Sequence, residues 1–154
     1  MKRIFDFIMG LFLLSFLSVP ILIVALMVKL TSKGPVLYWS DRVGRDNKIF
    51  KMPKFRTMRI DTPPVATHLL TNPDAYLTSI GSFLRKFSLD ELPQLWSILK
   101  GHMSFVGPRP LLMQYLDRYT LEQARRHEVK PGITGWAQIN RRSAGVDPRR
   151  TLRD

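Results

Sequence analysis

The chain has 154 residues, of which 45% are hydrophobic, and 24 Lys and Arg against 12 Asp and Glu give a formal net charge of +12. It contains no cysteine, which excludes disulfides, thiolate zinc sites and a cysteine nucleophile, and which fits a reducing compartment. The positive excess predicts an anionic partner, which is nucleic acid, anionic lipid or a phosphorylated substrate, and composition does not choose among them.

The hydrophobic residues are concentrated near the N-terminus. From Phe7 to Val28 there are 22 consecutive residues without a charge, and 18 of them are hydrophobic. A helix of this length, at about 1.5 Å per residue, just covers a hydrocarbon core of about 30 Å. The run is too long for the apolar part of a cleaved signal peptide, and no Ala-x-Ala-like cleavage site follows it. We therefore expect the segment to be retained.

Two features of this run bear on whether it spans a membrane or re-enters on the same side. Basic residues flank both ends, with Lys2 and Arg3 before it and Lys29 after it, which favours two cytoplasmic ends. Pro20 lies inside the run, where a proline kinks or breaks a helix, and Ser18 can hydrogen-bond the carbonyls that are freed. The residues alone support a kinked spanning helix and a re-entrant helix about equally.

The remaining 121 residues carry a net charge of +9 and can build one modest core but not two. Breaker residues at 31–35 mark the exit from the apolar segment. Strand-like residues at 36–39 and 48–51 flank a turn at 44–47, which predicts a β-hairpin. The segment 62–74 is predicted to be a loop.

Three helices are predicted in the second half of the chain, over residues 77–86, 91–99 and 111–129. The first carries Ile80 and Leu84, with Phe87 just beyond it, on one side. The second has the apolar i, i+3, i+4, i+7 stripe of a helix packed on a core, formed by Leu92, Leu95, Trp96 and Leu99. The third begins after Pro110 and is stopped by Pro131. The expected fold class is therefore mainly α with a small β-hairpin.

Asp90 and Glu91 are adjacent carboxylates at the start of the second of these helices. One explanation is structural, because Ser88-x-x-Glu91 matches a capping box and acidic residues favour the N-terminal end of a helix. The other is functional, because an ionised Asp beside a second carboxylate can bind Mg²⁺ or attack an electrophile. Considered alone, the pair favours the structural explanation.

Several fixed positive charges accompany this pair, namely Lys51, Lys54, Arg56, Arg85 and Arg109. Arg109 lies between two prolines, which restricts its backbone and suits a guanidinium preset for bidentate phosphate contact. A nucleic-acid surface over residues 51–59 is disfavoured, because aromatic residues are few and no RNP, helix-turn-helix or zinc-finger pattern accompanies it. The histidines have no cysteine companions, so a zinc site is disfavoured too.

Six blocks after the apolar run share their order with a known family. They are residues 34–36 (GPV), 42–45 (RVGR), 54–58 (KFRTM), 88–95 (SLDELPQL), 103–110 (MSFVGPRP) and 131–138 (PGITGWAQ). With Lys2 and Arg3 before a proline-broken run, the chain resembles the bacterial sugar transferases. These are the monotopic polyprenyl-phosphate phosphoglycosyl transferases of the small catalytic-domain type. The family often has Ser-Pro at the helix break, where this chain has Ser18-Val19-Pro20.

The resemblance implies transfer of a sugar 1-phosphate from a UDP-sugar to a polyprenyl phosphate such as undecaprenyl phosphate. This step starts bacterial glycoconjugate assembly, such as that of O-antigen, capsule, exopolysaccharide or glycoprotein glycan. The family's nucleophile maps to Asp90, which would form a covalent aspartyl phosphosugar and release UMP before the lipid phosphate attacks. Asp90 and Glu91 would hold Mg²⁺, with Mn²⁺ as the alternative ion. Phosphate-binding residues map to Arg85 and Arg109, and Lys54 is a third candidate.

The resemblance also implies a re-entrant membrane helix over residues 1–33, broken at Ser18 and Pro20, with both ends cytoplasmic. A compact catalytic domain over residues 34–154 would lie on the cytoplasmic face of the bacterial inner membrane. The expected partners are UDP-sugar, polyprenyl phosphate and anionic lipids but not nucleic acid, and a homo-oligomer is left open. Members usually continue beyond the point matching Asp154, so the alternative is a C-terminally shortened, non-catalytic, membrane-associated homologue.

Overall fold

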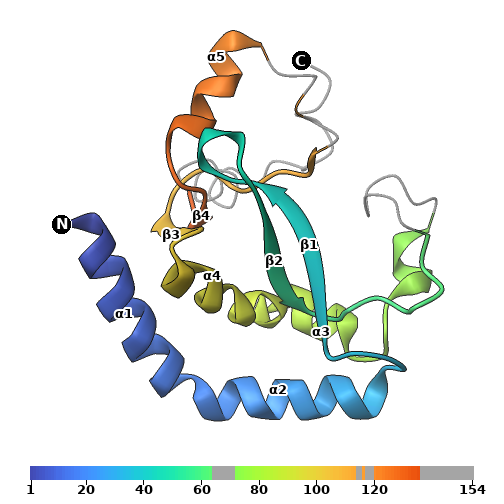
Figure 1. Cartoon of the computed structure of the whole chain (residues 1–154). Helices are drawn as coiled ribbons and strands as arrows, with labels where there is room; N and C mark the ends of the chain where they lie inside the picture. The colour runs from blue at the N-terminus through green and yellow to red at the C-terminus, as the bar shows by residue number, and fades with distance from the viewer. Residues whose placement is uncertain (64–71, 114–115, 117–119, 136–154) are drawn as a thin grey trace. The chain divides into compact units, whose positions relative to one another are not determined.

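The fold was analysed in a computed structural model, which describes residues 1–63, 72–113, 116 and 120–135 (Figure 1). Along the chain the elements are α1 (Lys2–Phe16), α2 (Ser18–Thr31), β1 (Leu37–Val43), η1 (Arg45–Asn47), β2 (Ile49–Phe55), η3 (Pro73–Tyr76), α3 (Gly81–Lys86), η4 (Leu89–Gln94), α4 (Leu95–Lys100), β3 (Ser104–Val106), α5 (Leu121–Ala124), η6 (Arg125–Glu128) and β4 (Gly132–Thr134). The described residues are thus mainly helical, as predicted.

The predicted hairpin is confirmed, and its strands β1 and β2 are longer than the sequence pattern indicated. The turn between them includes Asp46 and Asn47, which both adopt positive φ angles, of 56° and 58°. Asp and Asn tolerate this left-handed conformation better than other non-glycine residues, so this pair permits the reversal of the chain.

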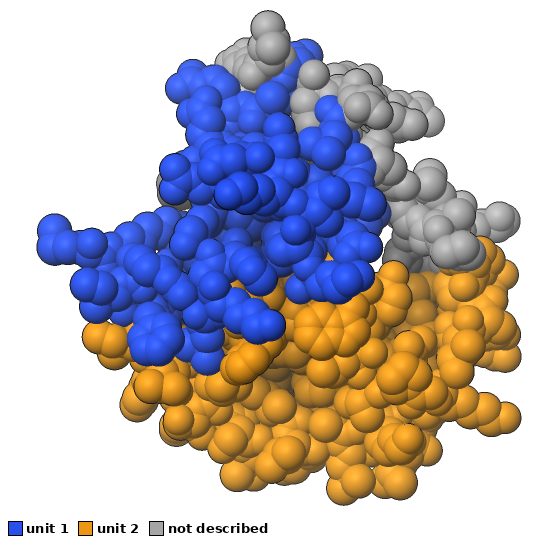
Figure 2. All heavy atoms as spheres, viewed as in Figure 1, with its two compact units in different colours: residues 1–7, 41–51, 98–154 blue, residues 8–40, 52–97 orange. Residues whose placement is uncertain are grey.

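Contacts within the chain divide it into two compact units, which Figure 2 shows in different colours. Unit 1 consists of residues 1–7, 41–51 and 98–154, and unit 2 of residues 8–40 and 52–97. These units differ from the predicted domains, a membrane segment over residues 1–33 and a catalytic domain over residues 34–154. The predicted boundary at residues 33/34 stays a prediction.

The core of unit 2 joins one face of α2 to the end of the hairpin and to α3. Val24 and Val28, one helical turn apart, are buried against Phe55, Ile80 and Leu84. Most of the other large apolar side chains of α2 are exposed. The helix therefore uses one stripe for folding and leaves a broad apolar surface uncovered.

The helices α1 and α2 are separated at Leu17 and meet at a bend of 62° (Figure 1). Ser18 donates a hydrogen bond of 2.7 Å to the carbonyl of Ser15. Pro20 lies in the first turn of α2, where a backbone amide would have no helical partner. Within the described residues, no single helix combines the length and apolar composition needed to cross a bilayer, whereas this bent pair meets both requirements together.

Unit 1 contains a parallel strand pair that the sequence pattern did not predict. In β3 and β4, Ser104 is aligned with Gly132 and Val106 with Thr134. A Cβ atom on Gly132 would lie 2.1 Å from the backbone nitrogen of Gly107, so this approach requires glycine. The strand pair thereby joins two of the sequence blocks, residues 103–110 and 131–138.

The first turn of α1 is bonded to this part of unit 1. The ammonium group of Lys2 donates to the carbonyl of Val106 at 3.0 Å. The guanidinium of Arg3 donates to the last carbonyls of α4, those of Ile98 and Leu99, at 2.5 and 2.6 Å. The buried carboxylate of Asp6 accepts a hydrogen bond of 3.4 Å from the backbone of Phe105. Lys2 and Arg3, the positive flank of the apolar run, therefore anchor α1 together with Asp6.

The helix predicted over residues 91–99 was partly wrong. The segment begins as the 3-10 helix η4 and becomes α-helical only at Leu95, because Pro93 lacks an amide and the 3-10 turn has a different period. The buried face consequently includes Gln94, Leu95 and Ile98, while Trp96 is 47% exposed rather than packed in the core.

The other two predicted helices are shorter in the structure. The first is α3, in which Leu84 is buried as predicted, whereas Phe87 beyond its end is exposed and packs on Phe83 instead of on the core. Of the helix predicted over residues 111–129, the structure describes α5 followed by η6, and residues 111–112 are not helical. Residues 114–115 and 117–119 lie outside the described part of the chain, as do 64–71 in the predicted loop.

Candidate active site

The adjacent acids Asp90 and Glu91 lie in the first turn of η4, in unit 2. Ser88 precedes this turn in a left-handed conformation, with φ 57° and ψ 23°, and its side chain makes no capping hydrogen bond. The carboxylate of Glu91 is bonded to Lys54 instead of to the backbone of Ser88. The capping box that would explain the pair structurally is therefore not formed.

The carboxylate of Asp90 is largely removed from water, because the residue is only 9% exposed. Burial raises the pKa of Asp90 above its ordinary value, and the neighbouring charge of Glu91 raises it further. The positive charges of Lys54 and Arg85 act in the opposite direction. Asp90 is thus a desolvated acid whose ionised form depends on two nearby cations.

Glu91 and Lys54 form an ion pair in which the ammonium nitrogen lies 2.8 Å from the carboxylate oxygen. The side chains are 18% and 17% exposed, so water screens this pair much less than a surface pair. Lys54 comes from β2, whereas Glu91 comes from η4. The pair therefore ties the acidic turn to the hairpin within unit 2.

Arg85 lies near the end of α3 and is half-buried. Its Nε donates a 3.0 Å hydrogen bond to the hydroxyl of Thr57. Burial lowers the pKa of Arg85, while the negative charges of Asp90 and Asp74 oppose that shift. Four of the five predicted site residues, Lys54, Arg85, Asp90 and Glu91, are thus brought together in one unit. Thr57, which contacts Arg85, was not predicted from the sequence as part of this group.

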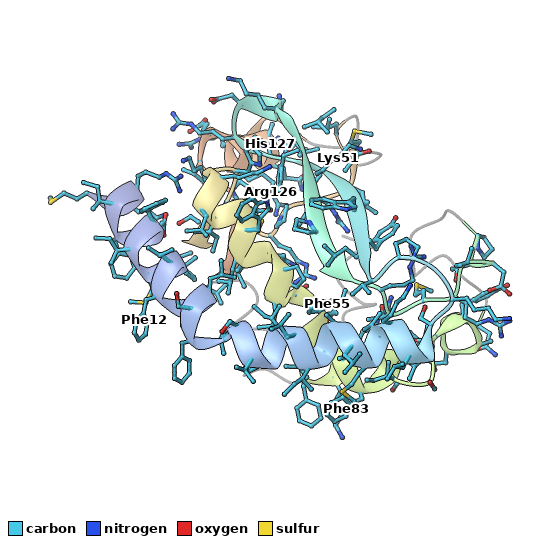
Figure 3. All side chains as sticks on the ribbon, turned by 60° about the horizontal axis from the view of Figure 1, so that its bottom comes forward. Phe12, Lys51, Phe55, Phe83, Arg126 and His127 are labelled. Carbon is cyan, nitrogen blue, oxygen red and sulfur yellow. The ribbon has the colours of Figure 1, made fainter. Side chains whose placement is uncertain are left out.

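The remaining predicted site residue, Arg109, belongs to unit 1. It lines a small, shallow depression with Pro108, Pro110, Arg126 and His127 among its neighbours. Arg126 donates a 3.0 Å hydrogen bond to the carbonyl of Arg109, and His127 is buried beside it. Figure 3 labels both side chains, which come from η6. Burial lowers the pKa of His127, and the charge of Arg126 lowers it further.

Two other basic residues noted in the sequence have structural contacts. Lys51 forms an exposed ion pair of 3.2 Å with Asp41. The Nε of Arg56 donates to the carbonyl of Pro35 at 2.9 Å. These contacts give both side chains a local role in holding the hairpin and the segment before it.

Among the described residues, the predicted metal ligands are the two carboxylates of Asp90 and Glu91. No three acidic or histidine side chains among them are grouped as a metal-binding cluster. Asp90 and Glu91 offer two carboxylates on one turn, which leaves most positions around a cation to other ligands. Such a pair suits Mg²⁺, which commonly binds one or two carboxylates together with substrate phosphates and water.

Comparison with known proteins gives a consistent result. A family model described as "Bacterial sugar transferase" matches residues 1–153. The "Uncharacterized sugar transferase EpsL" of Bacillus subtilis (strain 168) is 52% identical over 144 residues, which are 94% of this chain and 70% of that protein.

Two further relatives have names that state a reaction. The "UDP-glucose:undecaprenyl-phosphate glucose-1-phosphate transferase" of Escherichia coli (strain K12) is 44% identical over 91% of this chain and 31% of that protein. The "UDP-N-acetylgalactosamine-undecaprenyl-phosphate N-acetylgalactosaminephosphotransferase" of Aeromonas hydrophila is 37% identical over 90% of this chain and 33% of that protein. The chain thus spans about a third of the length of these two relatives.

Proposed function

Because the chain belongs to the bacterial sugar transferase family, we propose that it transfers a sugar 1-phosphate from a UDP-sugar to undecaprenyl phosphate. The names of the Escherichia coli and Aeromonas hydrophila relatives support this class of donor and acceptor. The observation that carries the proposal is the buried carboxylate of Asp90, on which the positive charges of Lys54 and Arg85 both act. The product, a polyprenyl-diphosphate sugar, would start the assembly of a bacterial glycoconjugate.

The proposed reaction has two steps at one phosphorus atom. An oxygen of Asp90 attacks the phosphorus that bears the sugar, the bond from that phosphorus to the bridging oxygen breaks, and UMP leaves with the bridging oxygen. An oxygen of the lipid phosphate then attacks the same phosphorus, and the bond to Asp90 breaks. The carboxylate is regenerated, so the enzyme is unchanged at the end of the cycle.

The surroundings of Asp90 suit this role. A buried carboxylate has lost part of its hydration shell, and the charges of Lys54 and Arg85 favour its ionised, nucleophilic form. Positive charge near the attacked phosphorus also offsets the charge that develops on the phosphoryl oxygens and the leaving UMP. Arg85 and Lys54 are the proposed phosphate ligands of unit 2, and Arg109 of unit 1 is proposed as a phosphate ligand from its Pro-Arg-Pro sequence alone.

We also propose that Asp90 and Glu91 hold Mg²⁺, with Mn²⁺ as the alternative ion, when the diphosphate is bound. The negative charge of Glu91 raises the pKa of Asp90, because two neighbouring carboxylates repel each other in a partly buried site. A bound cation would relieve this repulsion. The cation would neutralise charge on the diphosphate and on the leaving group. Glu91 is held by Lys54, which fixes the position of the second carboxylate.

The N-terminal helix pair is proposed to enter the membrane and return to the cytoplasmic side. Two sets of contacts support this topology. The first turn of α1 is bonded to unit 1 through Lys2, Arg3 and Asp6. The last turns of α2 are buried in the core of unit 2 through Val24 and Val28. Each end of the pair is thus bonded to a folded unit, α1 to unit 1 and α2 to unit 2, as expected for a segment whose two ends stay outside the hydrocarbon core.

The exposed side chains of the pair support contact with lipid. The large apolar residues that remain exposed on α1 and α2 include Phe5, Ile8, Leu11, Phe12, Phe16, Leu22, Ile23 and Leu26. Figure 3 shows Phe12 pointing away from the ribbon. An uncovered apolar surface of this kind is unusual on a protein that contacts only water. The basic residues at both ends would attract anionic headgroups of the inner membrane.

The reaction is tested by intact-protein mass spectrometry after incubation with UDP-glucose, UDP-galactose or UDP-N-acetylgalactosamine and Mg²⁺, without lipid acceptor. With one of the three UDP-sugars, we expect one sugar phosphate to be added to the protein and an equal amount of UMP to be released. Asp90→Asn should form no adduct, whereas Asp61→Asn, an exposed acid of the same unit, should behave like the wild type. A folded, membrane-bound wild type that forms no adduct would instead support the shortened, non-catalytic homologue.

A further inference from the structure

We propose that Thr57 is a positioning residue of the donor site, whose hydroxyl holds Arg85 by its Nε atom so that the terminal nitrogens of Arg85 face the donor's phosphate groups. The proposal rests on the proposed function, because it takes Arg85 as a ligand of the UDP-sugar diphosphate. Thr57 belongs to the block of residues 54–58, and no role follows for it from the sequence pattern.

The contact that carries this inference is the 3.0 Å hydrogen bond from the Nε of Arg85 to the Oγ1 of Thr57. Thr57 is only 6% exposed, so its hydroxyl is held in a fixed environment. Within the part of the chain that the structure describes, the terminal nitrogens of Arg85 donate no hydrogen bond. One edge of the guanidinium is therefore fixed, while the edge suited to bidentate phosphate binding has no hydrogen-bond partner among the described residues.

The partner of Arg85 is neutral, which matters for binding an anion. A carboxylate at the position of Thr57 would neutralise the guanidinium, whereas a hydroxyl orients it and leaves its positive charge uncompensated. Asp90 and Asp74 act on Arg85 through space, and among the described residues neither of them forms an ion pair with it. Lys54, by contrast, is already paired with Glu91. Arg85 is thus the better placed of the two cations to receive a phosphate.

The backbone of Thr57 is itself held against the start of α3. Its carbonyl accepts hydrogen bonds from the amide of Thr78 at 2.9 Å and from the hydroxyl of Thr78 at 3.3 Å. A Cβ atom on Gly81 would lie 2.1 Å from the same carbonyl oxygen, so α3 can begin here only with glycine. Arg85 follows Gly81 by four residues, which is about one helical turn. Thr57 therefore contacts α3 twice, through its backbone at Gly81 and through its side chain at Arg85.

The inference is tested by measuring the Kd of UDP, in the presence of Mg²⁺, for the full chain in detergent micelles. Thr57→Val keeps the shape of the side chain and removes the hydroxyl, and we expect it to weaken UDP binding about tenfold. Thr57→Ser restores the hydroxyl and should bind UDP to within about threefold of the wild type. With a UDP-sugar that the enzyme accepts, the loss in Thr57→Val should appear mainly as a raised KM.

Thr78→Val is the matched control, because Thr78 is 7% exposed and also donates through its hydroxyl. That bond goes to the carbonyl of Thr57, which the amide of Thr78 continues to hold after the substitution. We expect Thr78→Val to lower the thermal midpoint about as much as Thr57→Val while UDP affinity changes less than about twofold. Equal losses of UDP affinity in both valine variants would show a general structural effect and overturn the proposal.

A double-mutant comparison tests whether Thr57 acts through Arg85. We expect Thr57→Val to have no further effect on UDP binding when Arg85→Ala is already present. An undiminished tenfold loss in that background would overturn the proposal, as would wild-type affinity in Thr57→Val alone.

Failure of the proposed function gives a different result. The wild type would then form no adduct with any UDP-sugar, while the comparison of UDP affinities would still decide the role of Thr57. A wild type that does not bind UDP would overturn both, because Arg85 would then have no diphosphate to hold.

Discussion

The ammonium nitrogen of Lys54 lies 2.8 Å from the carboxylate of Glu91, and less than a fifth of either side chain is exposed. Removing one partner of a pair so little exposed strongly destabilises the folded protein, because the other charge is left buried without compensation. Lys54 also acts on the adjacent Asp90, whose pKa it lowers against the effect of burial. One lysine therefore affects both the folding of the acidic turn and the ionisation of the proposed nucleophile.

Lys54→Met is expected to move the pH dependence of UMP release. Removing the positive charge raises the pKa of Asp90 further, so the ionised carboxylate needed for attack forms only at higher pH. The acid limb of the rate profile should shift to higher pH, and the free energy of unfolding in urea should fall by about 3 kcal/mol. Lys51→Met, which removes a lysine from an exposed pair, should leave the profile in place. An unmoved acid limb in Lys54→Met would contradict this assignment.

Asp90→Asn should stabilise the fold at neutral pH. The pKa of Asp90 is raised in the folded state, so its stabilising contribution is present below the unfolded pKa and is lost as pH rises through the folded pKa. Above the folded pKa the wild type buries a charge that asparagine does not carry. We expect the Tm of the variant to exceed that of the wild type at pH 7. The difference should shrink towards pH values near 4, the ordinary range for Asp.

This experiment is a thermal unfolding series across pH, with Asp61→Asn as the control. Asp61 is exposed and paired with Arg59 at the surface, so its removal should produce no stabilisation at pH 7. A wild type more stable than Asp90→Asn at neutral pH would mean that the nearby cations outweigh burial at Asp90.

Gly81→Ala should affect both stability and phosphate binding. The added Cβ atom would lie 2.1 Å from the carbonyl oxygen of Thr57, so α3 must move away from Thr57 and carry Arg85 with it. We expect unfolding to become easier by about 1–3 kcal/mol, as for other overpacked sites, and UDP to bind more weakly. Ser82→Ala, at an exposed position of the same helix, should change neither quantity. Unchanged UDP affinity in Gly81→Ala would show that α3 can shift without disturbing the site.

Arg3→Met should loosen the anchor at the start of α1. The variant loses two hydrogen bonds to the carbonyls of Ile98 and Leu99, and we expect a loss of about 1 kcal/mol in the free energy of unfolding. Lys33→Met removes a positive charge from the other flank of the helix pair and serves as the matched control. Equal losses in the two variants would indicate an effect of overall charge rather than of the anchor.

The proposed topology predicts the accessibility of single cysteines in this cysteine-free chain. One cysteine is inserted before Lys2 and another replaces Lys33, so that they flank the helix pair. Both should resist an impermeant thiol reagent applied to the periplasmic side of intact cells and react after the membrane is opened. Labelling of the N-terminal cysteine alone in intact cells would establish a spanning helix.

Local sequence signals predicted those parts of the fold that local residues determine. The hairpin follows from a turn at Asp46 and Asn47 between strand-forming residues. The helix predicted over residues 77–86 ends where α3 ends, at Lys86, although α3 begins only at Gly81. The parallel pair of β3 and β4 escaped prediction because each strand has three residues, too few to show a period. The helical spacing of Trp96 predicts a core position, whereas the preceding 3-10 turn rotates it outward.

The candidate site was predictable in its charged members only. Lys54, Arg85, Asp90 and Glu91 are charged, and the family resemblance assigns each of them a role in the sequence. Thr57 carries no charge and lies 28 residues from Arg85, so its hydrogen bond arises only from the packing of α3. The pKa of Asp90 was equally hidden, because a carboxylate in the first turn of a helix would be expected to ionise readily, whereas burial has the larger effect here.

The anchor at the start of α1 has a consequence for how the chain is made. Lys2, Arg3 and Asp6 bond to residues that lie 95 to 104 positions later in the sequence. A ribosome therefore completes the entire apolar helix pair before the partners of its first turn exist. During that interval the pair can be shielded only by lipid or by a chaperone. In the proposed topology the helix pair would therefore reach the membrane before the bonds of Lys2, Arg3 and Asp6 can form.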